Sequence, residues 1–138
     1  MEASCVICRN ARPLDVIAEL PTTWVTAPPT APLPGYVCVV AKRHVAEPFE
    51  LREEESAAFW SESMAVAAAV NELIKPSKMN YEIHGNTIPH LHLHLFPRFA
   101  GDPFEGCPID GRRTGFKRSA REIARLAAAI ERSSNPAG

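Results

Sequence analysis

Residues 89–97 read PHLHLHLFP and hold three of the chain's five histidines, each followed by one apolar residue. Strict alternation predicts a β-strand with one buried face. Leu91, Leu93 and Leu95 would point into a core, and the three imidazoles would share the opposite face, about 6.5 Å apart along the strand. Ring nitrogens need hydrogen-bond partners, and the imidazole charge changes near neutral pH. Such a face therefore favours a site that handles a phosphate, a proton or a metal.

A solvent-exposed strand that is rich in histidine by chance is the plain alternative. It is disfavoured because Thr or Lys would be the ordinary residues of an exposed strand. Alternating histidines on one strand can also chelate zinc. The spacing alone does not decide between a phosphate-handling site and a metal site, so both stay open at this point.

The bulk composition predicts one globular domain over residues 1–138. A chain of 138 residues buries about two-thirds of its unfolded surface, and 46% apolar with 22% charged residues excludes a disordered chain. The formal net charge of -1 argues against nucleic acid or a membrane surface as partners. No apolar stretch is long enough for a bilayer and no leader pattern opens the sequence, so we expect a cytoplasmic protein.

Hydrophobic patterns predict several strands around one long helix. A helix is expected over residues 50–74, because acidic residues crowd its first turns and Pro76 ends it. Its apolar surface is wider than one sheet face needs, which indicates a homodimer. Ser119 and Glu122 form a capping box at the start of a last helix. Strands are expected at residues 16–20, 24–26, 36–41, 79–83 and in the histidine stretch, with irregular chain at 27–35 and 100–114 and a disordered tail at 133–138.

These elements define an α+β fold with an antiparallel sheet, one long helix and one C-terminal helix. Near the start of the chain, Cys5 and Cys8 form a Cys-x-x-Cys pair. Taken alone, this pair fits a redox pair, half of a zinc knuckle or chance. The four cysteines in total are expected to be free or metal-bound rather than paired in disulfides, since no export signal is recognised.

The sequence resembles the histidine triad (HIT) family of nucleotide hydrolases and transferases. The stretch HLHLHL matches the family signature of three histidines alternating with apolar residues. Residues 79–89 resemble the approach to the triad in bacterial members. Residues 35–44, GYVCVVAKRH, resemble the family strand that ends in a basic pair and a histidine. The resemblance covers residues 5–99 and implies a HIT-like fold, a nucleotide substrate and no organic cofactor.

The resemblance also implies a division of labour in the site. His92 would attack the α-phosphate and carry a covalent nucleotidyl intermediate, with one ring nitrogen fixed as a donor to a backbone carbonyl. His94 would donate to a phosphate oxygen in the transition state. Thr87 and Asn86 match the place where family members set a side chain near the leaving group. Asn80 is a further residue expected to contact substrate.

A second implication of the resemblance is a structural zinc ion. In some bacterial members a Cys-x-x-Cys pair joins two histidines, one of which is the first of the triad. Cys5, Cys8, His44 and His90 would supply a closed tetrahedral site of this kind. In the alternative, both histidines order the active site through hydrogen bonds and the cysteines carry no metal.

The expected activity is cleavage at a nucleotide α-phosphate. Dinucleoside polyphosphates such as diadenosine tetraphosphate are expected first, nucleoside phosphoramidates second and phosphorolysis third. A non-catalytic nucleotide-binding module and a zinc hydrolase that uses His90, His92 and His94 as ligands are the alternatives. One departure concerns residues 27–32, APPTAP, which stand where many HIT members carry acidic residues facing the ribose. Ribose recognition of the usual kind is therefore not expected.

Overall fold

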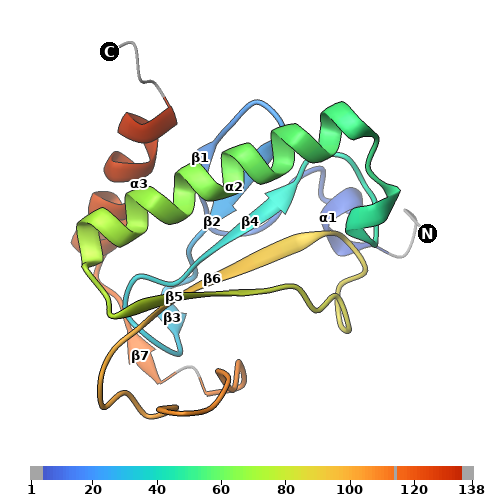
Figure 1. Ribbon diagram of the computed structural model, residues 1–138. Coiled ribbons are helices and arrows are strands. Elements are labelled where there is room, and N and C mark those ends of the chain that lie inside the picture. Colours follow the sequence, from blue (N-terminus) through green and yellow to red (C-terminus); the bar gives the residue numbers. More distant parts are fainter. Residues whose placement is uncertain (1–4, 114, 135–138) are drawn as a thin grey trace.

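The computed structural model describes residues 5–113 and 115–134. Its centre is a five-stranded antiparallel sheet with the strand order β1-β2-β4-β6-β5 (Figure 1). The antiparallel α+β architecture predicted from the sequence is therefore confirmed. The strands of this sheet are β1 (Val16–Glu19), β2 (Thr23–Thr26), β4 (Val37–Ala41), β5 (Lys78–Glu82) and β6 (His92–Arg98).

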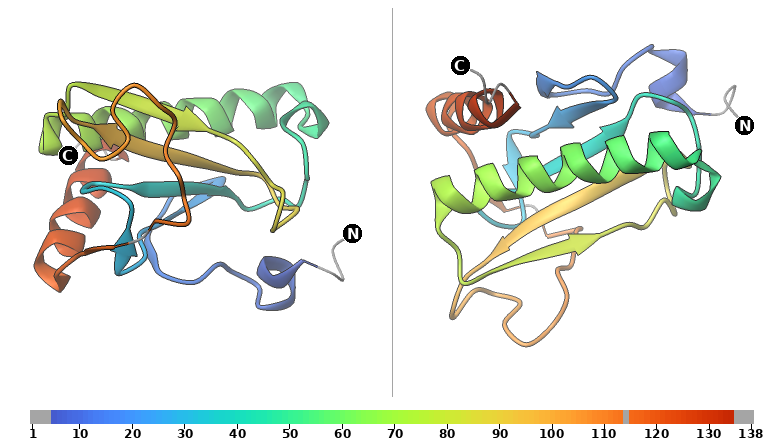
Figure 2. Two further views of the ribbon diagram at one scale, coloured as in Figure 1. Left: turned by 90° about the horizontal axis from the view of Figure 1, so that it is seen from below. Right: turned by 45° about the horizontal axis from the view of Figure 1, so that its top comes forward.

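Helices lie on both faces of the sheet. The long helix α2 (Glu53–Ile74) crosses one face, and the short helix α1 (Val6–Arg9) lies against the other (Figure 2). α3 (Ala120–Ser134) packs beside α2 and near β1. α2 starts three residues later than predicted, because Pro48–Glu50 form a separate 3-10 turn, η2. It ends at Lys75, whose backbone is left-handed with φ 52°.

The two faces of the sheet bury different kinds of residue. Leu91, Leu93 and Leu95 are at most 1% exposed and belong to the apolar core that α2 and α3 cover, as the alternation predicts. The opposite face carries a second cluster that includes Tyr36 and Phe96 together with α1 residues. The polar site is built on this second face.

The histidine strand begins later than predicted. β6 starts at His92, and His90 lies in the turn before it, where its backbone N–H donates to the carbonyl of Ile88. Pro89 has no N–H to offer a ladder, which favours this break. Two of the three histidines are therefore on the strand proper, and their cross-strand partners on β4 are Val40 for His92 and Cys38 for His94.

Part of the proline-rich segment expected to be irregular pairs with two residues that lie just beyond the second such segment. Thr30–Ala31 (β3) and Phe116–Lys117 (β7) form a small antiparallel ladder. It brings the proline-rich segment to the start of α3, where the Ser119 hydroxyl accepts from the Glu122 N–H at 3.1 Å, as the capping box predicts. Of the tail expected to be disordered, Ser133 and Ser134 form the end of α3, and residues 135–138 lie outside the described residues.

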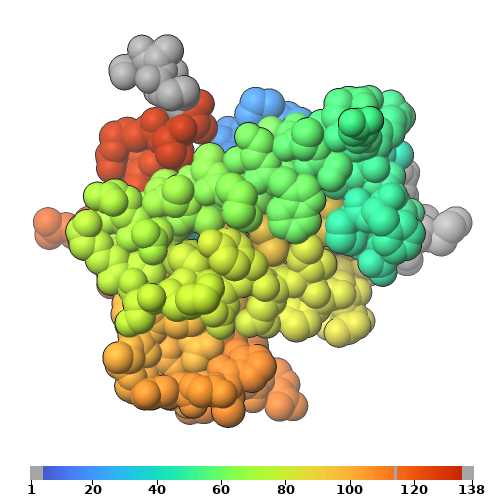
Figure 3. All heavy atoms as spheres, in the orientation of Figure 1, coloured from blue at the N-terminus to red at the C-terminus, as the bar shows by residue number. Residues whose placement is uncertain are grey.

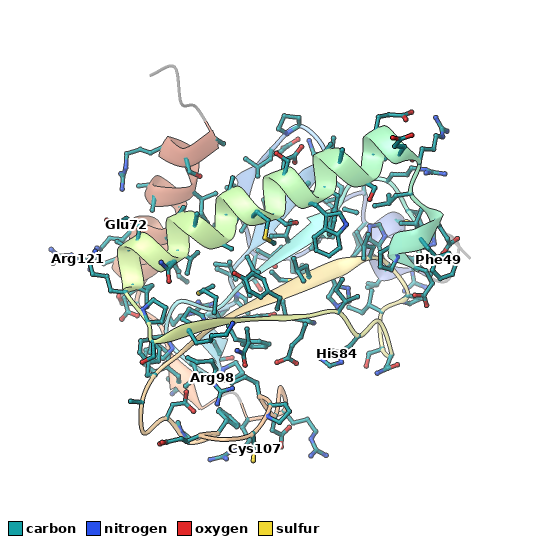
Figure 4. All side chains as sticks on the ribbon, viewed as in Figure 1. Phe49, Glu72, His84, Arg98, Cys107 and Arg121 are labelled. Carbon is teal, nitrogen blue, oxygen red and sulfur yellow. The ribbon has the colours of Figure 1, made fainter. Side chains whose placement is uncertain are left out.

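The loop after β6 is organised by one ion pair. The Arg98 guanidinium donates to both carboxylate oxygens of Asp102, and it also donates to the Asn80 side chain and to the carbonyls of Phe104 and Cys107. Arg98 points from the sheet into this loop, and Cys107 lies at its outer edge (Figure 4). The loop lies below β5 on the face that Figure 3 presents, with α2 across the upper part. The Arg98 guanidinium thus supplements the apolar contacts that Phe104 and Ile109 of this loop make with the second core cluster.

Candidate active site and metal cluster

Four ligand-type side chains meet just before β6. Cys5 caps α1, Cys8 lies in α1, His44 follows β4 and His90 precedes β6. The Cys8 sulfur is 3.2 Å from His44 Nδ1 and 3.7 Å from His90 Nδ1, and the Cys5 sulfur is 3.4 Å from His90 Nδ1. The four ligand atoms lie within 4.8 Å of one another. All the residues predicted as metal ligands are therefore brought together.

The cluster fits a tetrahedral metal ion. Zinc holds sulfur at about 2.3 Å and imidazole nitrogen at about 2.0 Å, so ligand atoms around it are about 3.3–3.8 Å apart. His90 Nε2 lies 2.6 Å from the carbonyl oxygen of Ala41 and donates to it, which leaves Nδ1 as a lone pair aimed at the cluster. Burial lowers the pKa of His90 and favours this neutral form. His44 Nδ1 lies only 3.2 Å from His90 Nδ1, an arrangement that a shared cation stabilises.

His92 has one nitrogen engaged and one open. Its Nδ1 is 2.6 Å from the carbonyl oxygen of His90 and donates to it, which is the hydrogen bond expected of a nucleophilic imidazole. Nε2 therefore carries the lone pair. The ring of His94 stands edge-on to it, with centroids 4.8 Å apart.

His94 is held by a residue that the sequence interpretation did not select. The Tyr36 hydroxyl oxygen lies 2.7 Å from His94 Nδ1. Burial lowers the pKa of His94 to about 4, helped by the charges of His92 and His84. His94 is therefore neutral near pH 7. Phe96 stacks on the Tyr36 ring at 4.7 Å and closes the back of the site.

A cavity of about 280 Å³ opens beside His92 and His94. One wall is the N-terminal segment, with Val6 and Ile7 from α1, and the others include Pro28, Tyr36 and Ile88. A groove of about 800 Å³ between β5 and the loop after β6 is larger, but no histidine lines it. Of these two cavities the smaller one joins a concave surface to histidine side chains, so it is the candidate active site.

The other predicted site residues lie apart from this cavity wall. Asn86 and Thr87 are exposed in the loop that leads to β6, next to Ile88 on the cavity rim. Asn80 accepts a hydrogen bond from Arg98 at 2.9 Å and lines the larger groove. The structure thus brings His92 and His94 together and does not bring Asn80 to them.

Sequence reasoning missed several cavity residues. Cys38 on β4 and Tyr36 just before it line the same cavity as the histidines, and this can be recognised only once the β4–β6 register is known. Asp15, the residue just before β1, is an acidic residue of the cavity lining. Arg118 is 7% exposed and donates to the carbonyls of Pro28 and Tyr36, so it ties the proline-rich wall to α3.

Within the described part of the chain, no helix is both long and apolar enough to cross a membrane.

A family model described as the HIT domain matches residues 9–101. The chain therefore belongs to the HIT domain family, as its sequence resemblance indicates. The bifunctional bis(5'-adenosyl)-triphosphatase/adenylylsulfatase of Arabidopsis thaliana is 26% identical over 95 residues, which are 65% of this chain and 53% of that protein. A bis(5'-adenosyl)-triphosphatase of Dictyostelium discoideum is 31% identical over 71 residues, 48% of each chain. The chain spans about half the length of these curated relatives.

Solved HIT structures share the fold. A histidine triad protein from Bradyrhizobium japonicum superposes with a TM-score of 0.76 at 28% identity, covering 86% of this chain and 88% of that one. A zinc-bound histidine triad family protein from Mycobacterium smegmatis has a TM-score of 0.70 at 22% identity and covers 99% of both chains. At that identity the second likeness supports the fold alone.

Proposed function

We propose that this chain cleaves a phosphoanhydride or phosphoramidate bond at a nucleotide α-phosphate through a covalent nucleotidyl-His92 intermediate. The observation that supports this most is the pair of hydrogen bonds around the two histidines. His92 donates from Nδ1 to the His90 carbonyl, so its Nε2 lone pair is free beside the cavity. His94 lines the same cavity. Binding alone would need no nucleophile with its tautomer fixed in this way.

In the proposed reaction His92 Nε2 forms a bond to the α-phosphorus while the bond from phosphorus to the leaving group breaks. The leaving group departs with the electron pair of its bond to phosphorus. Water then attacks the same phosphorus and loses a proton to the solvent, the N–P bond breaks, and its electron pair returns to Nε2. His94 donates to a non-bridging oxygen and offsets charge in both transition states. Asn86 and Thr87 act near the leaving group, a role that rests on the family resemblance and on their position in the loop before β6.

Dinucleoside polyphosphates are the substrates proposed first. The names of the two curated relatives, both bis(5'-adenosyl)-triphosphatases, favour this class. A panel should contain diadenosine tri- and tetraphosphate, an adenosine phosphoramidate, and the same substrates with inorganic phosphate for phosphorolysis. Turnover of one class at least tenfold above the others would name the leaving group, and no turnover of any would refute the proposal.

Histidine variants test the mechanism. His92→Ala should lose several orders of magnitude in kcat with the fold intact, because no other group on the cavity wall is an open imidazole nucleophile. His94→Ala should lose about 10²–10³-fold, as for one oxyanion donor. Acid-quenched protein should carry a nucleotidyl adduct on His92 during turnover. Wild-type activity in His92→Ala would refute the covalent mechanism. A nucleotidyl adduct on His94 would show that His94, and not His92, is the nucleophile.

Two alternatives predict other results. A non-catalytic nucleotide-binding module would bind the panel without turnover. A zinc hydrolase with the triad as ligands would need His92 and His94 around one ion. Among the described residues, ligand atoms close enough to share an ion are found in the Cys5, Cys8, His44 and His90 group, which contains neither of them. The geometry therefore favours the nucleophilic role.

We propose zinc as the metal of the cluster, in a structural role. Two thiolates and two imidazoles suit zinc, and a four-ligand site leaves no open position for substrate. When bound, the ion would fasten α1 to the sheet without activating water. This is why chelation should leave residual turnover while it lowers stability. A cytoplasmic location stays a prediction, as does the absence of nucleic-acid and membrane partners.

We also propose a homodimer through α2. α3 covers part of the apolar surface that suggested it, but Trp60 and Met64 stay 38% and 40% exposed, four residues apart on one stripe of the helix. Sedimentation at micromolar concentration should give twice the 15.1 kDa mass of the chain. The double variant Trp60→Glu, Met64→Glu should be a monomer, whereas Phe49→Glu, an exposed apolar site in η2, should not change the mass. A monomeric wild type would refute the dimer.

A further inference from the structure

Tyr36 is a buried polar side chain in direct contact with the triad. It is 9% exposed and precedes β4, and its hydroxyl oxygen reaches His94 Nδ1 at 2.7 Å. Its ring stacks with Phe96 at 4.7 Å between the ring centres, and the guanidinium of Arg118 lies 6.0 Å from the Tyr36 ring centre. The hydroxyl therefore has a fixed position relative to His94.

The direction of this hydrogen bond follows from the neighbours of the hydroxyl. Burial raises the pKa of Tyr36, so the phenol keeps its single proton. Its second partner is the Cys38 thiol, whose pKa burial raises to about 12 and which is also bonded to Thr26. A thiol is a weak acceptor and an imidazole nitrogen a strong one. The imidazole nitrogen is therefore the preferred acceptor of the single phenol proton, and Tyr36 donates to His94 Nδ1.

A neutral imidazole carries one proton, and the bond from Tyr36 decides where it sits. With Nδ1 acting as acceptor, the proton of His94 is on Nε2. Among the described residues His94 Nε2 has no protein partner, and His94 lines the cavity that it shares with His92. The one N–H of His94 is therefore available to a ligand in that cavity.

We propose that Tyr36 is a positioning residue that holds His94 in its Nε2–H tautomer, so that His94 can donate to a phosphate oxygen of the nucleotide. This rests on the proposed function for the identity of the acceptor, but not for the tautomer. The Nδ1 atoms of His92 and His94 then have opposite hydrogen-bonding roles, one as a donor and the other as an acceptor. The His90 carbonyl accepts from His92 Nδ1 and makes Nε2 a nucleophile, whereas the Tyr36 hydroxyl donates to His94 Nδ1 and makes Nε2 a donor.

Nuclear magnetic resonance of protein labelled with ¹⁵N-histidine reads the tautomer directly, before any substrate is added. Wild-type His94 should show a protonated Nε2 and an unprotonated Nδ1 at pH 7. In Tyr36→Phe, which keeps the ring and its stacking, the Nδ1–H form should become populated. Its kcat on the best substrate of the panel should fall about 10–100-fold, the usual effect of losing a partner that orients an active group, with KM changed less than threefold.

Tyr81→Phe is the matched control, because Tyr81 is the other tyrosine of the chain and is 47% exposed on β5. It should change neither the tautomer nor kcat. An Nδ1–H tautomer in wild-type His94, or an unchanged tautomer in Tyr36→Phe, would overturn the inference. A tautomer shift in Tyr36→Phe, with a wild type that turns over no nucleotide, would refute the proposed function and keep the tautomer assignment.

Discussion

At its first residues β6 adjoins two thiols and two imidazoles, whereas its last residue, Arg98, carries a guanidinium bound by a carboxylate. Polar contacts at each end of β6 hold another segment of the chain in place: α1 at one end and the loop after β6 at the other. The Arg98–Asp102 pair is complete within the protein, since each charge meets its opposite. The cluster of cysteines and histidines lacks such a match of opposite charges, because two like atoms, His44 Nδ1 and His90 Nδ1, lie 3.2 Å apart in it. The first pair is therefore satisfied by protein groups alone, and for the cluster the proposed zinc ion would supply the missing positive charge between the ligands.

Removing a cluster ligand should give the largest effect on stability. A metal present at a thousand times its dissociation constant contributes about 4 kcal/mol, so Cys8→Ser should lower the thermal midpoint by roughly 10–15 °C relative to the zinc-loaded protein. Cys107→Ser is the control, because Cys107 is an exposed cysteine outside the cluster. Elemental analysis of protein purified without added metal accompanies the melts. Less than a tenth of an equivalent of zinc, together with equal thermal midpoints for the two variants, would refute the proposed metal site.

Neutralising the ion pair should cost less and should not depend on metal. Asp102 is 3% exposed and accepts from Arg98 and from the backbone N–H groups of Phe99 and Phe104. Asp102→Asn should lower the free energy of unfolding by about 2 kcal/mol in urea, since charge-assisted bonds in a buried position are lost. Asp110→Asn is the control, because Asp110 pairs with an Arg112 side chain that is 92% exposed, and its effect should be too small to measure. Equal effects of the two variants would contradict the proposed role of the pair.

Lowering the pH should weaken the contacts at the two ends of β6 one after the other. We expect this effect to be smaller and more gradual than those of the two substitutions. The Arg98 hydrogen bonds hold the pKa of Asp102 at about 2, so this stabilisation is present above pH 3.8 and is lost as pH falls toward 2. Burial holds the pKa of His94 at about 4 against 6.5 when unfolded, so stability falls as pH drops from 6.5 to 4. Thiolates bind metal less well over the same upper window. Hydrogen exchange, corrected for intrinsic rates, should show α1 opening at a higher pH than residues 99–105.

The fold was predictable where its causes are local. Alternation placed Leu91, Leu93 and Leu95 in the core, and a proline with crowded acids bounded the long helix. The start of β6 was mispredicted because the alternation of side chains gives no information on backbone hydrogen bonds. Pro89 has no N–H to donate, and the strand begins only at His92. β3 was missed since its two residues pair only with Phe116–Lys117, far along the chain.

The site was predictable where residue type alone fixes the chemistry. His92 and His94 follow from the alternation together with the family resemblance. The grouping of Cys5 with His90, 85 residues apart, came from the resemblance and not from any local pattern. Tyr36 and Arg118 could not be selected from the sequence, because a tyrosine before a strand and an arginine before a helix are common. Their importance follows from long-range contacts, of Tyr36 with His94 and of Arg118 with Pro28.

The wall that α1 contributes to the cavity has a thermodynamic consequence. Val6 and Ile7 line the cavity, and the cysteines that flank them belong to the metal cluster. An ion that holds α1 in place also holds that wall in place, so the two binding equilibria share one free energy of coupling. Such coupling is reciprocal. A nucleotide bound in the cavity should lower the dissociation constant of the metal by the same factor by which the metal lowers the dissociation constant of the nucleotide.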